Sequence, residues 1–137
     1  MAYTIRAVDY YTTTVQDQPG EAYKLLSQLA EVGINLLAFT AVPIGPSRAH
    51  LTLFADDDEL LLETARRANM ALDGPTPAIL VQGDDSLGAL AQIHEKLARA
   101  EVNVFASSAV TDGRGSYGYV IYVRPEECER ATWALEM

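Results

Sequence analysis

Two short polar loops carry the residues of this sequence whose chemistry best suits a small ligand. Each loop ends in a glycine, Gly20 or Gly88, and precedes an apolar pattern of helical spacing. The unpaired backbone N–H groups at such a helix start attract an anion, and the carboxylate of a free amino acid would suit that place. Glycine permits close approach because it has no Cβ. Asn35 and Asn103 each open the next strand with a side chain that both donates and accepts hydrogen bonds.

Each of these residues also has a purely structural interpretation, which the sequence leaves open. The two glycines would serve the turns, and the two asparagines would cap the junctions between helix and strand. Asp17 and Asp85, at the start of the loops, would cap the helices that follow.

The other residues capable of chemistry do not form a catalytic or metal-binding pattern. His50 and His94 have no second histidine at metal-ligand spacing, and Cys128 is the only cysteine. The acidic run Asp56–Glu59 suits the start of a helix better than a hard cation. The glycine-rich stretch Asp112–Gly118 lacks the Lys-Ser/Thr pair of a phosphate loop. We therefore expect no catalytic residue, no metal and no cofactor.

An internal repeat with a constant offset of 68 residues brings the two loops into equivalent places. The matched pairs, which need no gap, are Asp17 with Asp85, Gly20 with Gly88, Leu29 with Leu97, Ala30 with Ala98, Asn35 with Asn103, Ala38 with Ala106, Gly45 with Gly113 and Thr64 with Thr132. The chain is interpreted as a duplication, with a first unit at residues 1–73 and a second at residues 74–137. Units of this size are marginal alone, so they should pack on each other.

Each unit is predicted to run strand, helix, strand, strand, helix. In the first copy the elements are a strand at 3–15, a helix at 20–32, strands at 36–42 and 49–55, and a helix from 56 to about 72. In the second they are a strand at 78–82, a helix capped by Asp85 or Ser86 and ending near 100, strands at 103–110 and 117–123, and a helix from Pro125. The turn-forming stretch 73–77 reads as a linker. This pattern predicts an α+β fold with both helices on one face of an antiparallel sheet.

The segment from Asp17 to Leu36 resembles the most recognisable part of the ACT domain, a small-molecule-binding regulatory module. The second copy matches this family more loosely, through Asp85–Gly88 and Ala100–Val104. The resemblance implies two tandem ferredoxin-like units and an amino-acid site at an interface between units, walled by the loop and the next strand. By the same resemblance Asp17 would meet the α-ammonium group through a charge-assisted hydrogen bond. The implied ligand contacts are Asp17, Gln18, Pro19, Gly20 and Asn35, with Asp85, Ser86, Gly88 and Asn103 as their counterparts.

The resemblance leaves one strand unaccounted for. An ACT unit has a fourth strand after its second helix, whereas the second copy here ends within or just after its last helix, at Leu135–Met137. Between the copies there is room for one strand rather than two. The long N-terminal segment, the other copy or another chain could supply the missing edge.

Composition and charge restrict the partners of the chain. With 137 residues and a net charge of −9, it lacks the basic face that nucleic acid or an anionic membrane requires. It shows no signal peptide and no long apolar run, so we expect a cytoplasmic protein. The expected function is a non-catalytic, allosteric module that binds an amino acid or a similar small metabolite. It would form a homodimer and signal to a separate metabolic enzyme or regulator.

Two other functions stay open at this point. One is an assembly module whose pocket has decayed, which the sequence barely separates from a sensor. The other is a small metal-dependent enzyme built from duplicated α+β units. That enzyme would need His and Glu ligands on strands of both copies, and only His50 fits the requirement.

Overall fold

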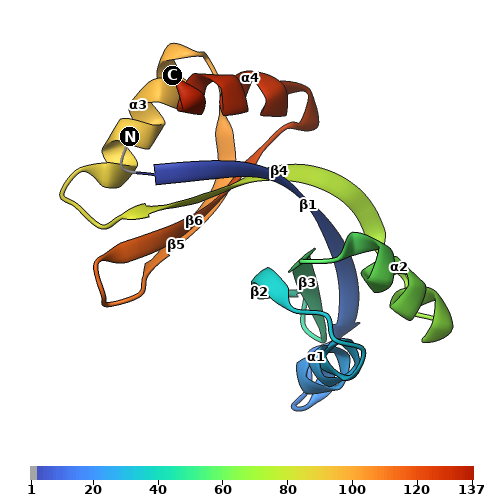
Figure 1. The fold of residues 1–137 in the computed structure, drawn as a ribbon. Helices are drawn as coiled ribbons and strands as arrows, with labels where there is room; N and C mark the ends of the chain where they lie inside the picture. Colours follow the sequence, from blue (N-terminus) through green and yellow to red (C-terminus); the bar gives the residue numbers. More distant parts are fainter. Residues whose placement is uncertain (1–2) are drawn as a thin grey trace. The chain divides into compact units, whose positions relative to one another are not determined.

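Helices and strands alternate along the chain in a computed structural model, which describes residues 3–137 (Figure 1). The elements are β1 (Tyr3–Gln16), α1 (Glu21–Glu31), β2 (Leu36–Ile44), β3 (Arg48–Ala55), α2 (Asp58–Arg67), β4 (Asp73–Asp84), α3 (Ala89–Arg99), β5 (Val104–Thr111), β6 (Ser116–Val123) and α4 (Pro125–Glu136). The strand order is β2-β3-β1-β4-β6-β5, and the pairs β2–β3, β3–β1, β4–β6 and β6–β5 are antiparallel. The predicted α+β class with antiparallel strands is confirmed.

The chain divides into two compact units, and β1 and β4 each contribute to both of them. We call Asp9–Pro75 the first unit, and residues 3–8 together with Thr76–Met137 the second unit. In the first unit, β1 lies between β3 and the start of β4. In the second unit, the remainder of β4 lies between the start of β1 and β6. Figure 1 shows β1 and β4 as long strands that run through both units.

The strand that the sequence left unaccounted for in the second unit comes from the N-terminal segment. Thr4 Oγ1 donates a hydrogen bond of 3.5 Å to the carbonyl oxygen of Gln82 in β4. The hydroxyl of Tyr3 donates to the carbonyl oxygen of Leu135 in α4 at 2.6 Å and accepts from Lys96 Nζ in α3 at 3.0 Å. Residues 3–8 are therefore the edge strand of the second unit and are held by both of its helices.

The start of β4 supplies the corresponding strand of the first unit. Gly74, with φ +139°, lies so close to β1 that a Cβ there would be 2.8 Å from the carbonyl oxygen of Tyr10 and from the ring of Tyr11. Glycine is thus required at this contact for both space and backbone conformation. With this strand, the first unit has the strand-helix-strand-strand-helix-strand order of a ferredoxin-like fold. The second unit has the same set of elements, but its edge strand comes first along the chain.

The two units repeat their geometry at the offset seen in the sequence. The bounds of α3 are those of α1 plus 68, and the bounds of β6 are those of β3 plus 68. A register irregularity between Leu36 and Ala38 recurs between Val104 and Ala106. The duplication therefore preserves strand pairing as well as residue types.

Both helices of each unit pack on one face of that unit's strands, as predicted. In the second unit the buried side chains of this face come from β4 (Ile79, Val81), β6 (Tyr117, Tyr119, Ile121, Val123), α3 (Ile93, Leu97) and α4 (Cys128, Ala131, Leu135). In the first unit they come from β1 (Tyr11), β3 (Leu51, Leu53, Ala55), α1 (Leu25, Leu29) and α2 (Leu61), with Ile34 after α1. The strand residues alternate along the chain, as one face of a pleated sheet requires.

Two predicted boundaries are wrong. The stretch 73–77 is the start of β4 rather than a linker. Two prolines are tolerated there because β6 pairs with β4 only from Ile79 onward, which leaves one side of this stretch unpaired. The helix expected to reach residue 72 ends at Arg67, since Asn69 adopts φ +53° and the N–H of Met70 bonds back to the carbonyl oxygen of Ala65 at 2.8 Å.

Candidate functional site

Each of the two polar loops is tied to the hairpin turn of its own unit. The N–H of Asp17 donates to the carbonyl oxygen of Ser47, and the N–H of Asp85 donates to that of Gly115, both at 2.9 Å. These bonds are equivalent at the offset of 68. The β1–α1 loop therefore lies beside the β2–β3 turn, and the β4–α3 loop beside the β5–β6 turn.

The glycines of the loops are required by backbone conformation. Gly20 and Gly88 are the N-cap residues of α1 and α3, with φ +90° and +82°. Among residues 3–137, a Cβ at either position would meet nothing within 4 Å, so space does not explain the glycines. No side chain in this part of the chain caps either helix, so the expectation that Asp85 or Ser86 caps α3 is wrong. Glycine is itself a common N-cap residue, so both helices begin without a capping side chain.

The start of α3 presents free backbone donors. The N–H of Ala89 bonds to the carbonyl oxygen of Ser86 at 3.1 Å. The next two N–H groups, of Leu90 and Ala91, bond to no backbone oxygen among residues 3–137. Together with the helix dipole, these two groups form a place that favours a negative charge.

A hollow of about 630 Å³ lies at this helix start. Its polar side chains are Asp85, Ser86, Thr111 and Tyr117, and its apolar ones include Leu87, Leu90 and Val110. No lysine or arginine among the described residues lines it. The lining residues are Asp85–Ala91 of the loop and α3, Ala109–Thr111 of β5, and Tyr117 of β6. An adjoining hollow of about 520 Å³ is lined in part by Asp84 and Asp112.

Tyr117, which lines both hollows, is a residue that the sequence did not single out for this site. Its side chain is 6% exposed, and its hydroxyl has no hydrogen-bond partner among residues 3–137. Burial raises the pKa of this hydroxyl, and the charges of Tyr3 and Asp84 raise it further. The equivalent residue of the first copy is Ala49, so a mismatch in the repeat was the only signal in the sequence.

The two asparagines lie far from the loops of their own units. Asn35 precedes β2, whereas the turn beside Asp17 follows β2, so the strand separates them by roughly 30 Å at ~3.3 Å per residue. The backbone N–H of Asn35 bonds to Asp56 Oδ1 at 3.1 Å, and the N–H of Asp56 bonds to the carbonyl oxygen of Asn35 at 2.9 Å. Asn103 is exposed at the equivalent place before β5. One unit therefore does not bring a loop and its asparagine into one site.

In the first unit, the loop residue Gln18 lines a hollow of about 360 Å³ together with Ser47 and Arg48. Asp17, Pro19 and Gly20 are exposed in the same loop. The first unit thus presents its loop as the second does, but with an arginine beside it where the second unit has Ser116.

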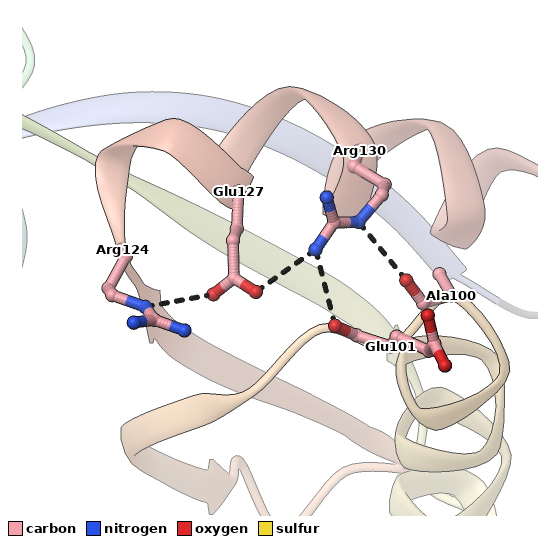
Figure 2. Close-up of polar contacts among 5 residues, drawn as sticks. All are labelled: Ala100, Glu101, Arg124, Glu127 and Arg130. Carbon is pink, nitrogen blue, oxygen red and sulfur yellow. Dashed lines mark hydrogen bonds and ion pairs between the residues drawn. The ribbon is translucent and has the colours of Figure 1, made fainter.

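An ion-pair network holds α4 against the far end of α3 (Figure 2). Arg130 donates from Nε to the carbonyl oxygen of Ala100 at 3.1 Å and from Nη2 to that of Glu101 at 3.2 Å. Its Nη2 also bonds to Glu127 Oε1 at 3.0 Å, while Glu127 Oε2 accepts from Arg124 Nε at 3.3 Å. Glu127 is only 6% exposed. The network fixes the C-terminal end of the helix whose N-terminal end borders the hollow.

Histidine, cysteine and acidic side chains outside the loops are the remaining groups capable of chemistry. Among residues 3–137, no group of three or more His, Cys, Asp or Glu side chains could hold a metal ion. His94 Nε2 is bonded to the hydroxyl of Tyr119, which donates to Ser107 Oγ at 2.9 Å. From the sequence we consider His94 only as a metal ligand, and the pattern does not predict this network. Across residues 3–137, no helix has the length and apolar character needed to span a membrane.

The fold is similar to solved structures of regulatory domains, although sequence comparison finds nothing. No protein-family model and no curated protein matches the chain. Protein BT0572 from Bacteroides thetaiotaomicron has a TM-score of 0.82 at 15% identity, over 96% of this chain and 88% of that one. The ligand-free regulatory subunit of aspartate kinase from Thermus thermophilus has a TM-score of 0.66 at 20% identity, over 99% and 95%. A putative C-terminal regulatory domain of aspartate kinase from Porphyromonas gingivalis has a TM-score of 0.55 at 17% identity, over 98% and 94%.

These likenesses establish the class of fold. The chain has an α+β, ferredoxin-like architecture in each of its two units, similar to that of the regulatory subunit of aspartate kinase. At 15–20% identity the likeness shows the fold alone.

Proposed function

We propose that this protein is a non-catalytic regulatory module that binds an amino acid, or a similar small metabolite, beside the Asp85–Gly88 loop. The observation that carries the proposal is the pair of free N–H groups, of Leu90 and Ala91, next to a hollow of about 630 Å³. A hollow of this size is within the range of small-molecule sites.

The chemistry of the lining matches the parts of an amino acid. The N–H groups of Leu90 and Ala91 would hold the carboxylate. Asp85, whose side chain is exposed and makes no ion pair within residues 3–137, would hold the ammonium group. Leu87, whose side chain is fully exposed, and Val110, which is 73% exposed, would cover an apolar side chain of the ligand.

A second copy of the chain would complete the site. Asn103 and Asn35 lie too far from the loops of their own units to contact the same ligand, so we assign them to the neighbouring chain of a homodimer. A ligand held between two chains tightens their association, because binding and association are linked. The tightened dimer would then act on a separate metabolic enzyme, a role supported by the regulatory proteins that share the fold. Asp17, Gln18, Pro19 and Gly20 would form the counterpart site of the first unit.

The test is a thermal-shift screen of the twenty amino acids and related metabolites. A ligand at a hundred times its dissociation constant should stabilise the fold by about 2.7 kcal/mol, which corresponds to roughly 9 °C in Tm for a chain of this length. Asp85→Asn should abolish the shift at matched ligand concentration. Asp17→Asn makes the same change in the counterpart loop and tests whether that loop binds the ligand as well. A shift that survives Asp85→Asn and disappears with Asp17→Asn would move the site to the first unit.

One observation favours a second function, that of an assembly module. β5 is an edge strand without a charged residue, and its Phe105 and Val110 are 57% and 73% exposed. Uncharged exposed edges pair readily with other strands. A flat ligand screen together with a stable dimer in sedimentation would favour assembly without a ligand. A monomer at all concentrations would contradict both forms of the proposal.

A further inference from the structure

A polar hollow of about 540 Å³ lies in the first unit, between β1 and the first turns of α1, and it adjoins the hollow lined by Gln18. Its floor is the edge of β1 from Thr13 to Val15. One wall is a face of α1, and the other is the connection from α2 to β4, at residues 68–71. Arg48, at the start of β3, closes one end. None of the residues assigned to the amino-acid site lines this hollow.

The edge of β1 is open on the side of the hollow. β3 pairs with β1 from Tyr11 to Gln16 on one side only. On the other side β4 begins at Asp73, and its Gly74 already lies against Tyr10 and Tyr11. No residue of β4 is therefore left to pair with the backbone beyond this point. Backbone polar groups at an open edge are available to a ligand.

Thr13 presents an unused hydroxyl to this hollow. The residue is only 7% exposed and points to the core face, between Tyr11 and Val15. Its hydroxyl makes no hydrogen bond within residues 3–137. Unlike Tyr117 Oη, which is fully buried, the hydroxyl of Thr13 is accessible from the hollow. Burying an unpaired hydroxyl is costly, and the second copy avoids that cost with Val81 at the equivalent position.

The cations of the hollow point to an anionic ligand. Arg48 makes no ion pair and no side-chain hydrogen bond within residues 3–137, whereas the equivalent residue of the second copy is Ser116. Lys24 also lines the hollow, where it makes a loose, exposed ion pair of 3.4 Å with Glu21. Two of the ten basic residues of a chain with net charge −9 therefore meet at one cavity. The second copy has Gln92 in place of Lys24.

We propose that this hollow binds a small metabolite through a single oxyanion group, a carboxylate or a phosphate. The guanidinium of Arg48 would hold the oxyanion, since its fork of donors matches two oxygens of such a group. The hydroxyl of Thr13 would donate to the same group, and Lys24 would add a second charge. Glu21 and Asp73, which also line the hollow, repel ligands with several negative charges. The site therefore favours a ligand with one oxyanion group over a ligand with several.

This inference is independent of the amino-acid site at the Asp85–Gly88 loop, because the two hollows share no residue. A ligand here would contact β1, α1 and the α2–β4 connection at once. Binding would then stiffen the first unit, whatever binds to the second.

The experiment is a titration of the full chain with acetate, glycine and inorganic phosphate, each followed by the backbone amide signals in NMR at constant ionic strength. We expect saturable shifts at Thr13–Val15 and at residues 68–71 with one of these probes. Arg48→Gln and Thr13→Val should each weaken that binding by about tenfold, the usual effect of losing one charge-assisted or buried hydrogen bond. Acetate or glycine as the stronger probe would identify a carboxylate, and phosphate a phosphoryl group.

The control is Arg114→Gln, which removes the same charge from the exposed turn of the second unit. It should leave the affinity unchanged within about twofold, since distant exposed charges are screened by salt. An equal loss with Arg114→Gln would reduce the effect to general attraction and overturn the proposal. Shifts that never saturate, or that appear only at Asp85–Ala91, would overturn it as well. Thr13→Val should fold at least as well as the parent chain, so a loss of binding cannot be ascribed to unfolding.

Discussion

Tyr117 and Tyr119 lie two residues apart on the same face of β6, and removing their hydroxyls should have opposite effects on stability. The hydroxyl of Tyr117 is buried and has no hydrogen-bond partner in the described part of the chain, whereas that of Tyr119 is bonded to both His94 and Ser107. Both rings lie in the core of the second unit, at 6% and 4% exposure. The two changes to phenylalanine therefore remove the same atom from nearly the same place.

The magnitude follows from the cost of leaving a buried polar group unpaired, which is about 1–3 kcal/mol. Tyr117→Phe relieves that cost, so the free energy of unfolding should rise by up to this amount. For 137 residues, at ~2.1 cal/mol/K of unfolding entropy per residue, the Tm should rise by roughly 3–10 °C. Tyr119→Phe should instead lower the free energy of unfolding by about 1–3 kcal/mol, because it removes two hydrogen bonds.

The assay is urea unfolding followed by circular dichroism, with both variants measured at pH 7 and again above pH 10. Burial raises the pKa of Tyr117, so the folded parent chain holds its proton more tightly than the unfolded chain does. The parent chain should therefore lose stability as the pH rises above 10, and Tyr117→Phe should lose less. A lower stability for Tyr117→Phe than for the parent chain would refute the reasoning, since it would mean that the hydroxyl makes a favourable interaction after all.

Three further changes test other parts of the structure. Burial raises the pKa of Asp58, and Asp9 and Asp57 raise it further, so the parent chain should lose stability as the pH rises above the ordinary Asp pKa of 3.8. Asp58→Asn should flatten that slope in unfolding curves, and an unchanged slope would contradict the assignment. Gly88→Ala should lower the free energy of unfolding by about 1 kcal/mol through its φ of +82° alone, because no described atom lies within 4 Å of the new Cβ. Gly20→Ala should have the same effect, and a much larger loss of stability would contradict this explanation. Arg130→Gln should lower the free energy of unfolding by about 2–4 kcal/mol in the same assay, because it breaks the bonds to Glu127, Ala100 and Glu101. Arg99→Gln, at an exposed i,i+4 ion pair, is the control and should lower it by less than about 0.5 kcal/mol.

The constant offset of the repeat made most of the fold predictable from the sequence. Helical spacing, glycine turns and the hairpin signals located both copies, and the strand pairing repeats at the same offset. The start of β4 was missed because its prolines suggested a linker, although an edge position tolerates them. The source of the fourth strand depends on long-range pairing between residues 3–8 and β4, which no local pattern encodes.

The candidate sites were predictable only in part. The loops at Gly20 and Gly88 were found from their residue types, but the distance from each loop to its asparagine depends on the length of the strand between them. Tyr117 and Arg48, which distinguish the two units, are places where the copies differ rather than agree. A search for matches in a duplication finds the shared scaffold, whereas the mismatches identify what each copy has gained.

The second unit includes residues 3–8, which are far in sequence from its other elements, and this sets the order in which the two units can fold. During synthesis, Asp9–Pro75 is finished early and contains nearly every contact that it needs. Residues 3–8 are made even earlier, yet their partners in β4, α3 and α4 come last, and the bond from Tyr3 to Leu135 spans 132 positions. Residues 3–8 therefore cannot complete their contacts until β4, α3 and α4 have left the ribosome. The first unit is in effect an insertion within the second, so trimming residues 3–8 would damage the unit at the opposite end of the sequence.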